Sequence, residues 1–287
     1  MKAALGSLCA LMKNNKVAAS KNSFDVRIVR YEYIHSIKAE FFDRLVKAVD
    51  PRNSEALLDA GCGYGAVTRE ILKRHKDKRL NCYLADSCDT QLSRACTELA
   101  NIGFGHESSL SFYKDDLVDT TFEDGTFNTI VAKMLIHEIP AEKQQVAINN
   151  AHTILKSGGK LIIWDMTLDE SNQRFIQDVI RMKDRLAGFH TLEANRYFLR
   201  LDELKFLLDK AGFKDVKLIY KIISPVVSKK RLKPEFGDSK LKLLQWHDFI
   251  RSKASDLDPS VLNRLQFKDE GDSISFTPPK AIIVATK

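Results

Sequence analysis

The chain has 287 residues, of which 44% are apolar, 29% charged and 9% aromatic, a composition that suffices for a sizeable core and excludes disordered and collagen-like proteins. The 45 basic and 38 acidic residues give a net charge of +7, which alone points toward nucleic acid, an anionic membrane or acidic substrates. No apolar run reaches the ~18 residues of a membrane-spanning helix. Five cysteines, an odd count, indicate reduced thiols and a cytoplasmic location.

Residues 1–55 are expected to form a leader followed by a helix that covers the domain. The leader is preferred over a secretory or organelle signal because its apolar run is short and interrupted, and both signals stay open. Between residues 26 and 49, apolar residues recur about every 3.6 positions, which predicts a helix. Tyr31 and His35 lie four residues apart on one face of this helix and are candidates for a substrate site, with ordinary packing as the alternative.

Residues 56–287 are expected to form one α/β domain, because short apolar stretches alternate with periodic helical segments. The predicted strands are 56–59, 82–86, 110–113, 129–132, 160–164, 216–223 and 281–285. The predicted helices are 67–74, 90–102, 142–155, 171–186 and 201–211. The spacing up to residue 165 predicts a parallel sheet with helices on both faces. After that the pattern loosens, so the domain divides into residues 56–165 and additions at 166–287.

A glycine loop carries the clearest chemical signal. Gly61, Gly63 and Gly65 follow the first strand and precede a helix, an arrangement that lets backbone approach a ligand and points N–H groups at it. This spacing also fits the dinucleotide pattern G-x-G-x-x-G/A, so a nicotinamide enzyme stays open. Asp59, at the strand end, would repel a pyrophosphate but attract an ammonium group.

Further carboxylates close the next two strands. Asp86 ends the second strand, where its two oxygens can hold two ribose hydroxyls. Asp115 and Asp116 end the third, where a carboxylate can accept a hydrogen bond from an exocyclic amine such as that of adenine. An ammonium group, a ribose and an adenine along one sheet edge describe S-adenosylmethionine.

In this region the sequence resembles the class I S-adenosylmethionine-dependent methyltransferases. Five segments match the family's motifs in order and spacing: 58–65 (LDAGCGYG), 85–92, 114–117 (KDDL), 122–131 and 155–161. Asn128 and Ser157 replace the usual aspartate and proline. The resemblance implies a Rossmann-like, doubly wound seven-stranded sheet, mostly parallel with one reversed edge strand. A helical N-terminal extension and C-terminal insertions would complete the fold.

The resemblance also implies S-adenosylmethionine as the cofactor. Asp59 and the glycines would hold its methionine end, Asp86 its ribose, and Asp115 with neighbouring backbone its adenine. The expected cofactor-binding residues are Asp59, Gly61, Cys62, Gly63, Gly65, Asp86, Ser87, Asp115, Asp116, Leu117 and Lys133. Alternatively, Asp59 caps the following turn, and Asp115 or Asp116 is a solvated loop residue.

Methyl transfer requires an aligned acceptor and exclusion of water, and a base only if the acceptor arrives protonated. His137, just past the fourth strand, is the candidate base, with helix capping or cofactor contact as alternatives. His190 and Tyr197, after the fifth strand, are further candidates for the substrate site. The cysteines lack metal-ligand spacing, so no metal is expected.

The expected acceptor is a small molecule methylated on oxygen, with nitrogen or carbon as the next choices. An RNA or protein methyltransferase and a non-catalytic cofactor-binding partner protein are the alternatives. The additions at 166–287 contain 23 basic and 17 acidic residues, so the positive charge belongs to the acceptor side. Its basic stretch, 210–242, is either a solvated face or attracts an anionic acceptor, a membrane surface or RNA.

Overall fold

The computed structural model describes residues 38–100, 102 and 108–287. The predicted substrate residues Tyr31 and His35 lie outside the described residues, as does the first part of the predicted N-terminal helix. The last part of that helix is α4 (Ala39–Val49).

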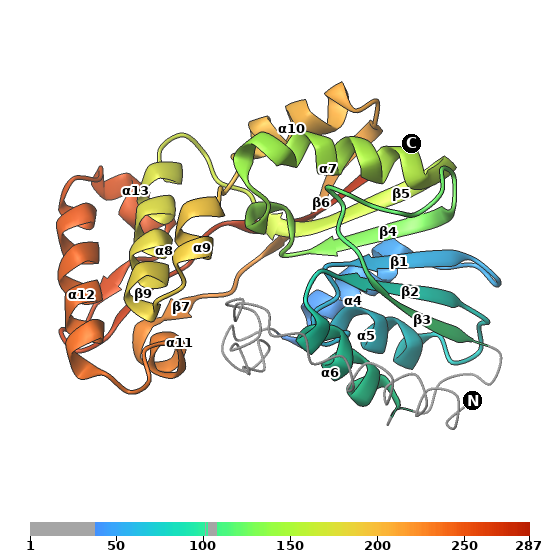
Figure 1. Cartoon of the computed structure of the whole chain (residues 1–287). Coiled ribbons are helices and arrows are strands. Elements are labelled where there is room, and N and C mark those ends of the chain that lie inside the picture. Colours follow the sequence, from blue (N-terminus) through green and yellow to red (C-terminus); the bar gives the residue numbers. More distant parts are fainter. Residues whose placement is uncertain (1–37, 101, 103–107) are drawn as a thin grey trace.

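A seven-stranded sheet forms the centre of the fold (Figure 1). Its strands are β1 (Ala56–Ala60), β2 (Asn81–Asp86), β3 (Ser109–Lys114), β4 (Phe127–Lys133), β5 (Leu155–Met166), β6 (Lys214–Ile222) and β10 (Lys280–Thr286), in the order β3-β2-β1-β4-β5-β10-β6. Only β10 runs against its neighbours, β5 and β6. This confirms the predicted seven-stranded, mostly parallel fold. The reversed strand lies next to the edge, between β5 and the edge strand β6.

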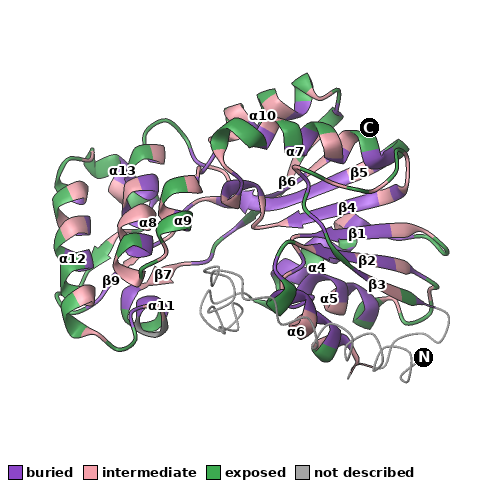
Figure 2. Ribbon diagram, in the orientation of Figure 1, coloured by how far each residue is buried: buried purple, intermediate pink, exposed green. Residues whose placement is uncertain are grey.

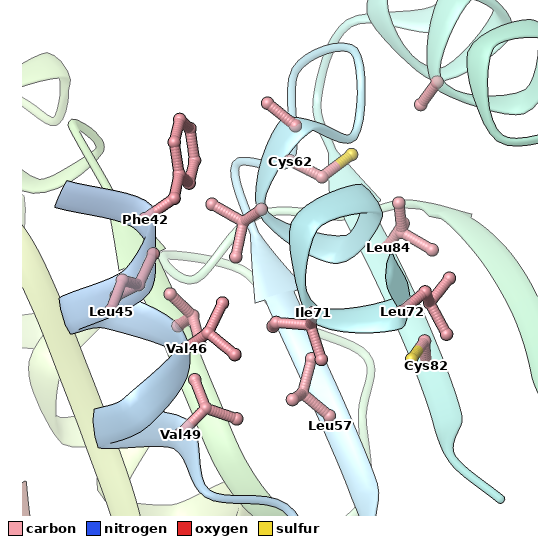
Figure 3. Packing of buried hydrophobic residues seen from close by; sticks show 14 of the residues in the cluster. Phe42, Leu45, Val46, Val49, Leu57, Cys62, Ile71, Leu72, Cys82 and Leu84 are labelled. Atoms are coloured by element: carbon pink, nitrogen blue, oxygen red, sulfur yellow. The ribbon is translucent and has the colours of Figure 1, made fainter. Parts of the chain in front are cut away.

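Helices cover both faces of the sheet, whose inner strands β1, β4, β5 and β10 are largely buried, whereas the edge strands β3 and β6 are mostly exposed or half-buried (Figure 2). One face is covered by α4, α5 (Ala66–Arg74) and α6 (Asp89–Ala100), and the other by α7 (Ala141–Ile154) and α10 (Leu201–Lys210). Leu45 of α4 and Ile71 of α5 are fully buried in the first core, with Leu57 of β1 (Figure 3). Each such side chain contributes about 1.5–3 kcal/mol through burial, so α4 is held by packing of its apolar side.

The additions at 166–287 separate into two groups. α10, β6 and β10 complete the central sheet and its covering. The rest forms a second layer beyond the carboxyl ends of the strands (Figure 1). We call this layer the cap: α8 (Gln173–Ala187), α9 (His190–Asn195), α11 (Ser228–Glu235), α12 (Lys240–Ser255), α13 (Pro259–Arg264), and the small sheet of β7 (Val226–Val227), β9 (Ile274–Phe276) and β8 (Lys268–Asp269).

The cap has its own apolar core, which includes Phe175, Ile176, Trp246 and Phe276. Trp246 of α12 is buried, and its indole Nε1 donates a hydrogen bond to the carbonyl oxygen of Val179 in α8 at 3.1 Å. The central indole is therefore both packed and hydrogen-bonded, which fixes α12 against α8.

Two further expectations concern the membrane and the cysteines. Among the helices of the described segments, none combines the length and apolar character needed to cross a bilayer. Cys62, Cys82 and Cys88 are buried and form no disulfide bond.

Candidate cofactor and acceptor site

A cavity of about 610 Å³ lies between the carboxyl ends of the central strands and the cap. It is lined by every predicted cofactor residue except Gly65, and also by His137. Ligands of open α/β folds bind at this edge of the sheet. The structure thus brings the sequence-predicted cofactor set together around one space.

The glycine loop shapes one end of this cavity. Gly61 and Gly63 line it with φ values of 64° and 54°, a left-handed backbone that disfavours any other residue. A Cβ at Gly61 would lie 2.6 Å from Cδ1 of Leu135, whereas one at Gly63 would meet no atom within 4 Å. Gly65 is the N-cap of α5 and also has a positive φ, 77°, and a Cβ there would lie 3.0 Å from Cδ1 of Leu99. Glycine at this position therefore permits both the turn into α5 and the close approach of α6.

Cys62, between the first two glycines, is buried, and its backbone N–H donates to the carbonyl oxygen of Ala85 at 2.9 Å. Burial, together with the nearby carboxylates of Asp59 and Asp86, raises the pKa of its thiol well above the usual value. A thiol that resists ionisation is a poor nucleophile. Cys62 therefore fills space in the loop.

Asp59 is 1% exposed and lies where β1 meets the loop. Its Oδ2 accepts hydrogen bonds from the backbone N–H and the hydroxyl of Thr68, at 3.2 and 2.8 Å. Burial raises the pKa of this carboxyl to about 6, although the Thr68 hydrogen bonds and the charge of Lys133 act in the opposite direction. Asp59 thus holds the first turn of α5 and lines the cavity at once.

Asp86 fastens the glycine loop to β2. Its Oδ2 accepts from the backbone N–H of Gly63 at 2.8 Å, and its Oδ1 accepts from that of Cys88 at 2.9 Å. Each carboxylate oxygen can accept a second hydrogen bond, and the residue lines the cavity. Asp86 can therefore hold the loop and two ligand hydroxyls together.

The adjacent residues Asp115 and Asp116 have different surroundings. Asp115 is 8% exposed, and its Oδ2 accepts from the backbone N–H and the hydroxyl of Thr121, both at 2.8 Å. Its Oδ1 is buried with no hydrogen-bond partner among the residues that the structure describes. The exposed Asp116 instead caps its own turn, accepting from the N–H groups of Val118 and Asp119. Asp115 therefore carries the buried acceptor that a ligand can satisfy.

His137, in the short helix η1 (Ile136–Glu138), is buried between two carboxylates. Its Nδ1 lies 2.5 Å from Oδ1 of Asp165, its Nε2 lies 3.4 Å from Oε1 of Glu138, and its ring stacks on Phe198. Burial lowers the pKa of the imidazole, but Asp165 and Glu138 outweigh burial and raise it to about 9.

This environment does not support the prediction that His137 is a general base. Because Asp165 and Glu138 raise the pKa of His137 to about 9, its protonated form is favoured at pH 7. Both ring nitrogens also face carboxylates, so the imidazolium is already hydrogen-bonded in the resting protein. Sequence reasoning missed this outcome because the two flanking carboxylates act together only in the folded chain.

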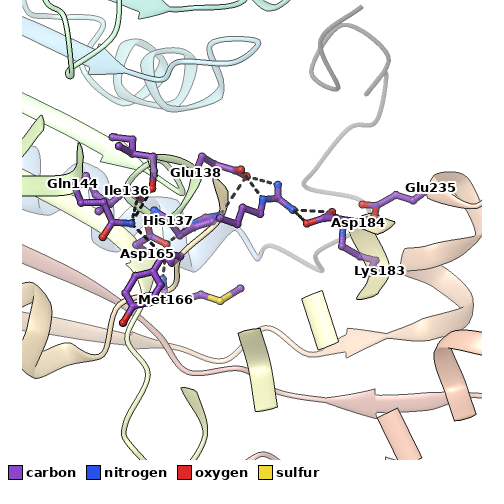
Figure 4. Close-up of polar contacts among 12 residues, drawn as sticks. Ile136, His137, Glu138, Gln144, Asp165, Met166, Lys183, Asp184 and Glu235 are labelled. Carbon is purple, nitrogen blue, oxygen red and sulfur yellow. Dashed lines mark hydrogen bonds and ion pairs between the residues drawn. The ribbon is translucent and has the colours of Figure 1, made fainter. Parts of the chain in front are cut away.

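A chain of buried charges continues from His137 into the cap (Figure 4). Both carboxylate oxygens of Glu138 accept from the guanidinium of Arg196, whose Nη1 donates to Oδ2 of Asp184 at 2.7 Å. The ammonium of Lys183 then lies 2.5 Å from Asp184 and 2.8 Å from Glu235. Charges alternate along this series, which joins the end of β5 to α8 and α11.

His190 and Tyr197, the other predicted substrate residues, do not line the cavity. The side chain of His190 is 78% exposed and faces Glu193 at 3.5 Å. The amide of Gln144 donates to the carbonyl oxygen of Tyr197 at 2.9 Å, and the phenol of Tyr197 donates to Glu203 at 3.2 Å. These contacts direct the Tyr197 ring toward α10, where it borders a separate surface depression.

Several lining residues lack any sequence signal. Those from the cap and the last strand include Lys183, Arg196, Phe198, Arg231, Trp246 and Lys280. They come from distant segments that share no motif, so only folding reveals their grouping. Asp165 could have been found, because it follows the apolar part of β5 as Asp86 follows that of β2.

Comparison with known proteins identifies the family. A family model described as a methyltransferase domain matches residues 29–218, so the chain belongs to this family. An uncharacterized methyltransferase of Geobacillus thermodenitrificans is 24% identical over 194 residues, covering 67% of this chain and 84% of that protein. A tRNA N(3)-cytidine methyltransferase of Bos taurus is 27% identical over 168 residues, covering 56% of this chain and 42% of that protein. A highly reducing polyketide synthase of Phaeosphaeria nodorum is 27% identical over 117 residues, or 41% of this chain and 4% of that protein.

Solved structures share the fold. The YcgJ protein from Bacillus subtilis superimposes with a TM-score of 0.72 at 16% identity, covering 87% of this chain and 99% of that chain. A phosphoethanolamine N-methyltransferase of Haemonchus contortus, in complex with phosphomonomethylethanolamine and S-adenosylhomocysteine, gives 0.55 at 17% identity, covering 94% of this chain and 60% of that chain. These likenesses show the fold, and the methyltransferase domain matched by residues 29–218 places the chain in the family of S-adenosylmethionine-dependent methyltransferases.

The residues present fit this cofactor. The buried, unpartnered Oδ1 of Asp115 offers an acceptor for the adenine amine. Gly63 leaves open space where any other residue would place a Cβ, and Asp86 keeps acceptor capacity for ribose hydroxyls. These observations support the residue assignments made from the sequence, which remain proposals.

The two adjacent aspartates supply a matched test of the adenine assignment. We expect Asp115→Ala to weaken S-adenosylhomocysteine binding roughly 10-fold or more, the value of a hydrogen bond to a charged group. Asp116→Ala should leave the affinity within about twofold, because its carboxylate only caps a turn. Isothermal titration calorimetry of both variants measures the difference. Equal losses in the two would contradict the assignment.

Proposed function

We propose that this methyltransferase acts on a small organic molecule that binds in the cap half of the cavity. The carrying observation is that a single cavity extends from the glycine loop to the cap. Buried apolar side chains from separate cap segments, Phe198, Leu232, Trp246 and Phe276, form part of its wall. A cavity of this size can hold the cofactor together with a compact methyl acceptor. Oxygen stays the predicted accepting atom, with nitrogen and carbon as the alternatives.

Methyl transfer from this cofactor requires little acid–base catalysis by the protein. When bound, S-adenosylmethionine supplies a methyl group that its sulfonium already activates. The apolar wall of the cap excludes water, and Asp59, Asp86 and Asp115 orient one reactant so that the acceptor can approach in line. His137, fixed as an imidazolium by Asp165 and Glu138, positions the segment after β4 instead of accepting a proton.

RNA is the second candidate acceptor, and a specific observation favours it: a tRNA N(3)-cytidine methyltransferase is among the relatives. The additions at 166–287 also carry the excess positive charge. The phosphoethanolamine enzyme with the same fold favours the small-molecule alternative. We prefer the small molecule because cap residues line the cavity and leave room for a compact acceptor.

A transfer assay separates these alternatives. The protein is incubated with methyl-labelled S-adenosylmethionine and either a small-metabolite extract or total tRNA, and label is measured in each pool. We expect labelling of a metabolite and none of tRNA above a no-enzyme control. Labelling confined to tRNA would refute the proposal. Binding of S-adenosylhomocysteine without transfer to either pool would favour the non-catalytic partner protein.

A further inference from the structure

The two ends of the cavity carry opposite charges. The end at the glycine loop and β3 is lined by aspartates: Asp59, Asp86, Asp115, Asp116 and Asp119. The cap end is lined by Lys183, Arg196, Arg231 and Lys280. Among the described lining residues after position 165, no aspartate or glutamate occurs. Glu138, which lines the cavity beside Arg196, is the acidic exception at this end, so basic groups outnumber acidic ones among the described charged side chains of the acceptor half.

Two of these basic groups are balanced by carboxylates, of which Glu138 lines the cavity and Asp184 and Glu235 do not. Arg196 pairs with Asp184 as well as Glu138, and Lys183 pairs with Asp184 and Glu235. Their charges maintain the link between sheet and cap. They do not by themselves require an anion in the cavity.

Lys280 is different. It begins β10, is 5% exposed, and its Nζ donates to the carbonyl oxygen of Ser224 at 3.0 Å. Within the described part of the chain, no carboxylate lies at ion-pair distance from this ammonium group. Arg231 is close enough to repel it electrostatically and Asp165 to attract it, and Arg231 also pairs with Glu235 at 3.4 Å. A buried ammonium with one neutral acceptor is costly unless an anion joins it.

We propose that the methyl acceptor carries an anionic group, a carboxylate or a phosphate, which Lys280 and Arg231 bind at the cap end of the cavity. This inference rests on the proposed function, because it describes the acceptor of that reaction. The guanidinium and the ammonium supply several N–H donors to one anion, while the aspartates at the opposite end repel it. The charge division thus sets the orientation in which the acceptor enters.

Binding of the anion is coupled to protonation of Lys280. Burial lowers the pKa of its amine to about 7, with Arg231 lowering it further and Asp165 raising it. The anion binds the protonated amine, which predominates below pH 7 and disappears as the pH rises above it. Affinity should therefore fall about 25-fold between pH 6.5 and 8.5. Arg231 stays charged across this range, and His137, which contacts Asp165, titrates above it.

The test uses the full chain saturated with S-adenosylhomocysteine and two anions that do not titrate in this range. Sulfate represents a phosphate-like group and acetate a carboxylate. Both tryptophans of the chain, Trp164 and Trp246, line the cavity, so intrinsic fluorescence and calorimetry can both follow binding. At pH 6.5 we expect one of the two anions to bind more tightly than the other. The affinity for that anion should fall about 25-fold between pH 6.5 and 8.5. The preferred anion identifies the acceptor's group.

Lys280→Met is the deciding variant, because it retains the length of the side chain without its charge. We expect at least a tenfold loss of anion affinity at pH 6.5, no remaining pH dependence, and unchanged S-adenosylhomocysteine affinity. Lys240→Met, which removes an exposed charge from α12, should behave as wild type.

Absence of anion binding to the wild type, or equal binding by Lys280→Met, would overturn the inference. Either result leaves the proposed function intact if label still reaches a metabolite. Label confined to tRNA refutes the proposed function whatever the anion titration shows.

Discussion

Arg196→Met is expected to lower the free energy of unfolding by about 3 kcal/mol, the low end of the 3–5 kcal/mol typical of breaking a buried ion pair. The guanidinium is buried between Glu138 and Asp184, and its removal leaves two buried carboxylates short of a cation. Lys183 still pairs with Asp184, and His137 still faces Glu138, which is why the lower figure applies. Urea unfolding monitored by circular dichroism gives the difference in free energy.

Arg185→Met, which removes an arginine from α8, provides the matched control. Its side chain is 64% exposed and pairs with Glu193, so its loss should cost no more than about 1 kcal/mol. Equal losses of stability in the two variants would show that the ion pairs of Arg196 do not hold the sheet and the cap together. A double variant, Arg196→Met with Asp184→Asn, should recover part of the loss because it removes one of the stranded charges.

The second large effect concerns the cofactor. Asp86→Ala is expected to weaken S-adenosylhomocysteine binding by about 1.5–3 kcal/mol, or roughly 10- to 150-fold. The carboxylate both holds the N–H of Gly63 and retains acceptor capacity for ribose, so its removal loosens the loop and deletes ligand contacts. Calorimetric titration of the purified variant measures the affinity.

Asp89→Ala is the control for this experiment. Asp89 lies three residues further on, at the start of α6, and pairs with Lys114 on the surface outside the cavity lining. Its substitution should change affinity less than twofold. If Asp86→Ala binds S-adenosylhomocysteine as tightly as the wild type, Asp86 only holds the glycine loop and does not contact the ligand.

The central fold could be predicted because its signals are local. The strand that ends at Asp59, the glycines after it and the carboxylates closing β2 and β3 each lie within a few residues of one another. In a parallel sheet the carboxyl ends of neighbouring strands meet at one edge. The local strand assignments therefore predict that these side chains lie close together. The position of β10 between β5 and β6 was beyond such reasoning, because pairing partners far apart in sequence leave no periodic signal.

The acceptor side shows the opposite case. His137 lies beside the cavity, and only the fold shows that the carboxylates of Asp165 and Glu138 face its two ring nitrogens. Tyr197 lies close in sequence to the cavity residues Arg196 and Phe198, but its ring faces α10. Position along the chain is therefore a weak guide to which side chains line the space.

The sequence by itself determined the class of protein, the cofactor and the edge of the sheet at which the cavity lies. Folding alone decided that two carboxylates raise the pKa of His137, that Arg196 joins sheet to cap, and that the buried Lys280 has no carboxylate at ion-pair distance among the described residues. The reason is physical: a strand or a turn follows from neighbouring residues, whereas a charge is tuned by whatever burial and long-range packing place within a few ångströms of it.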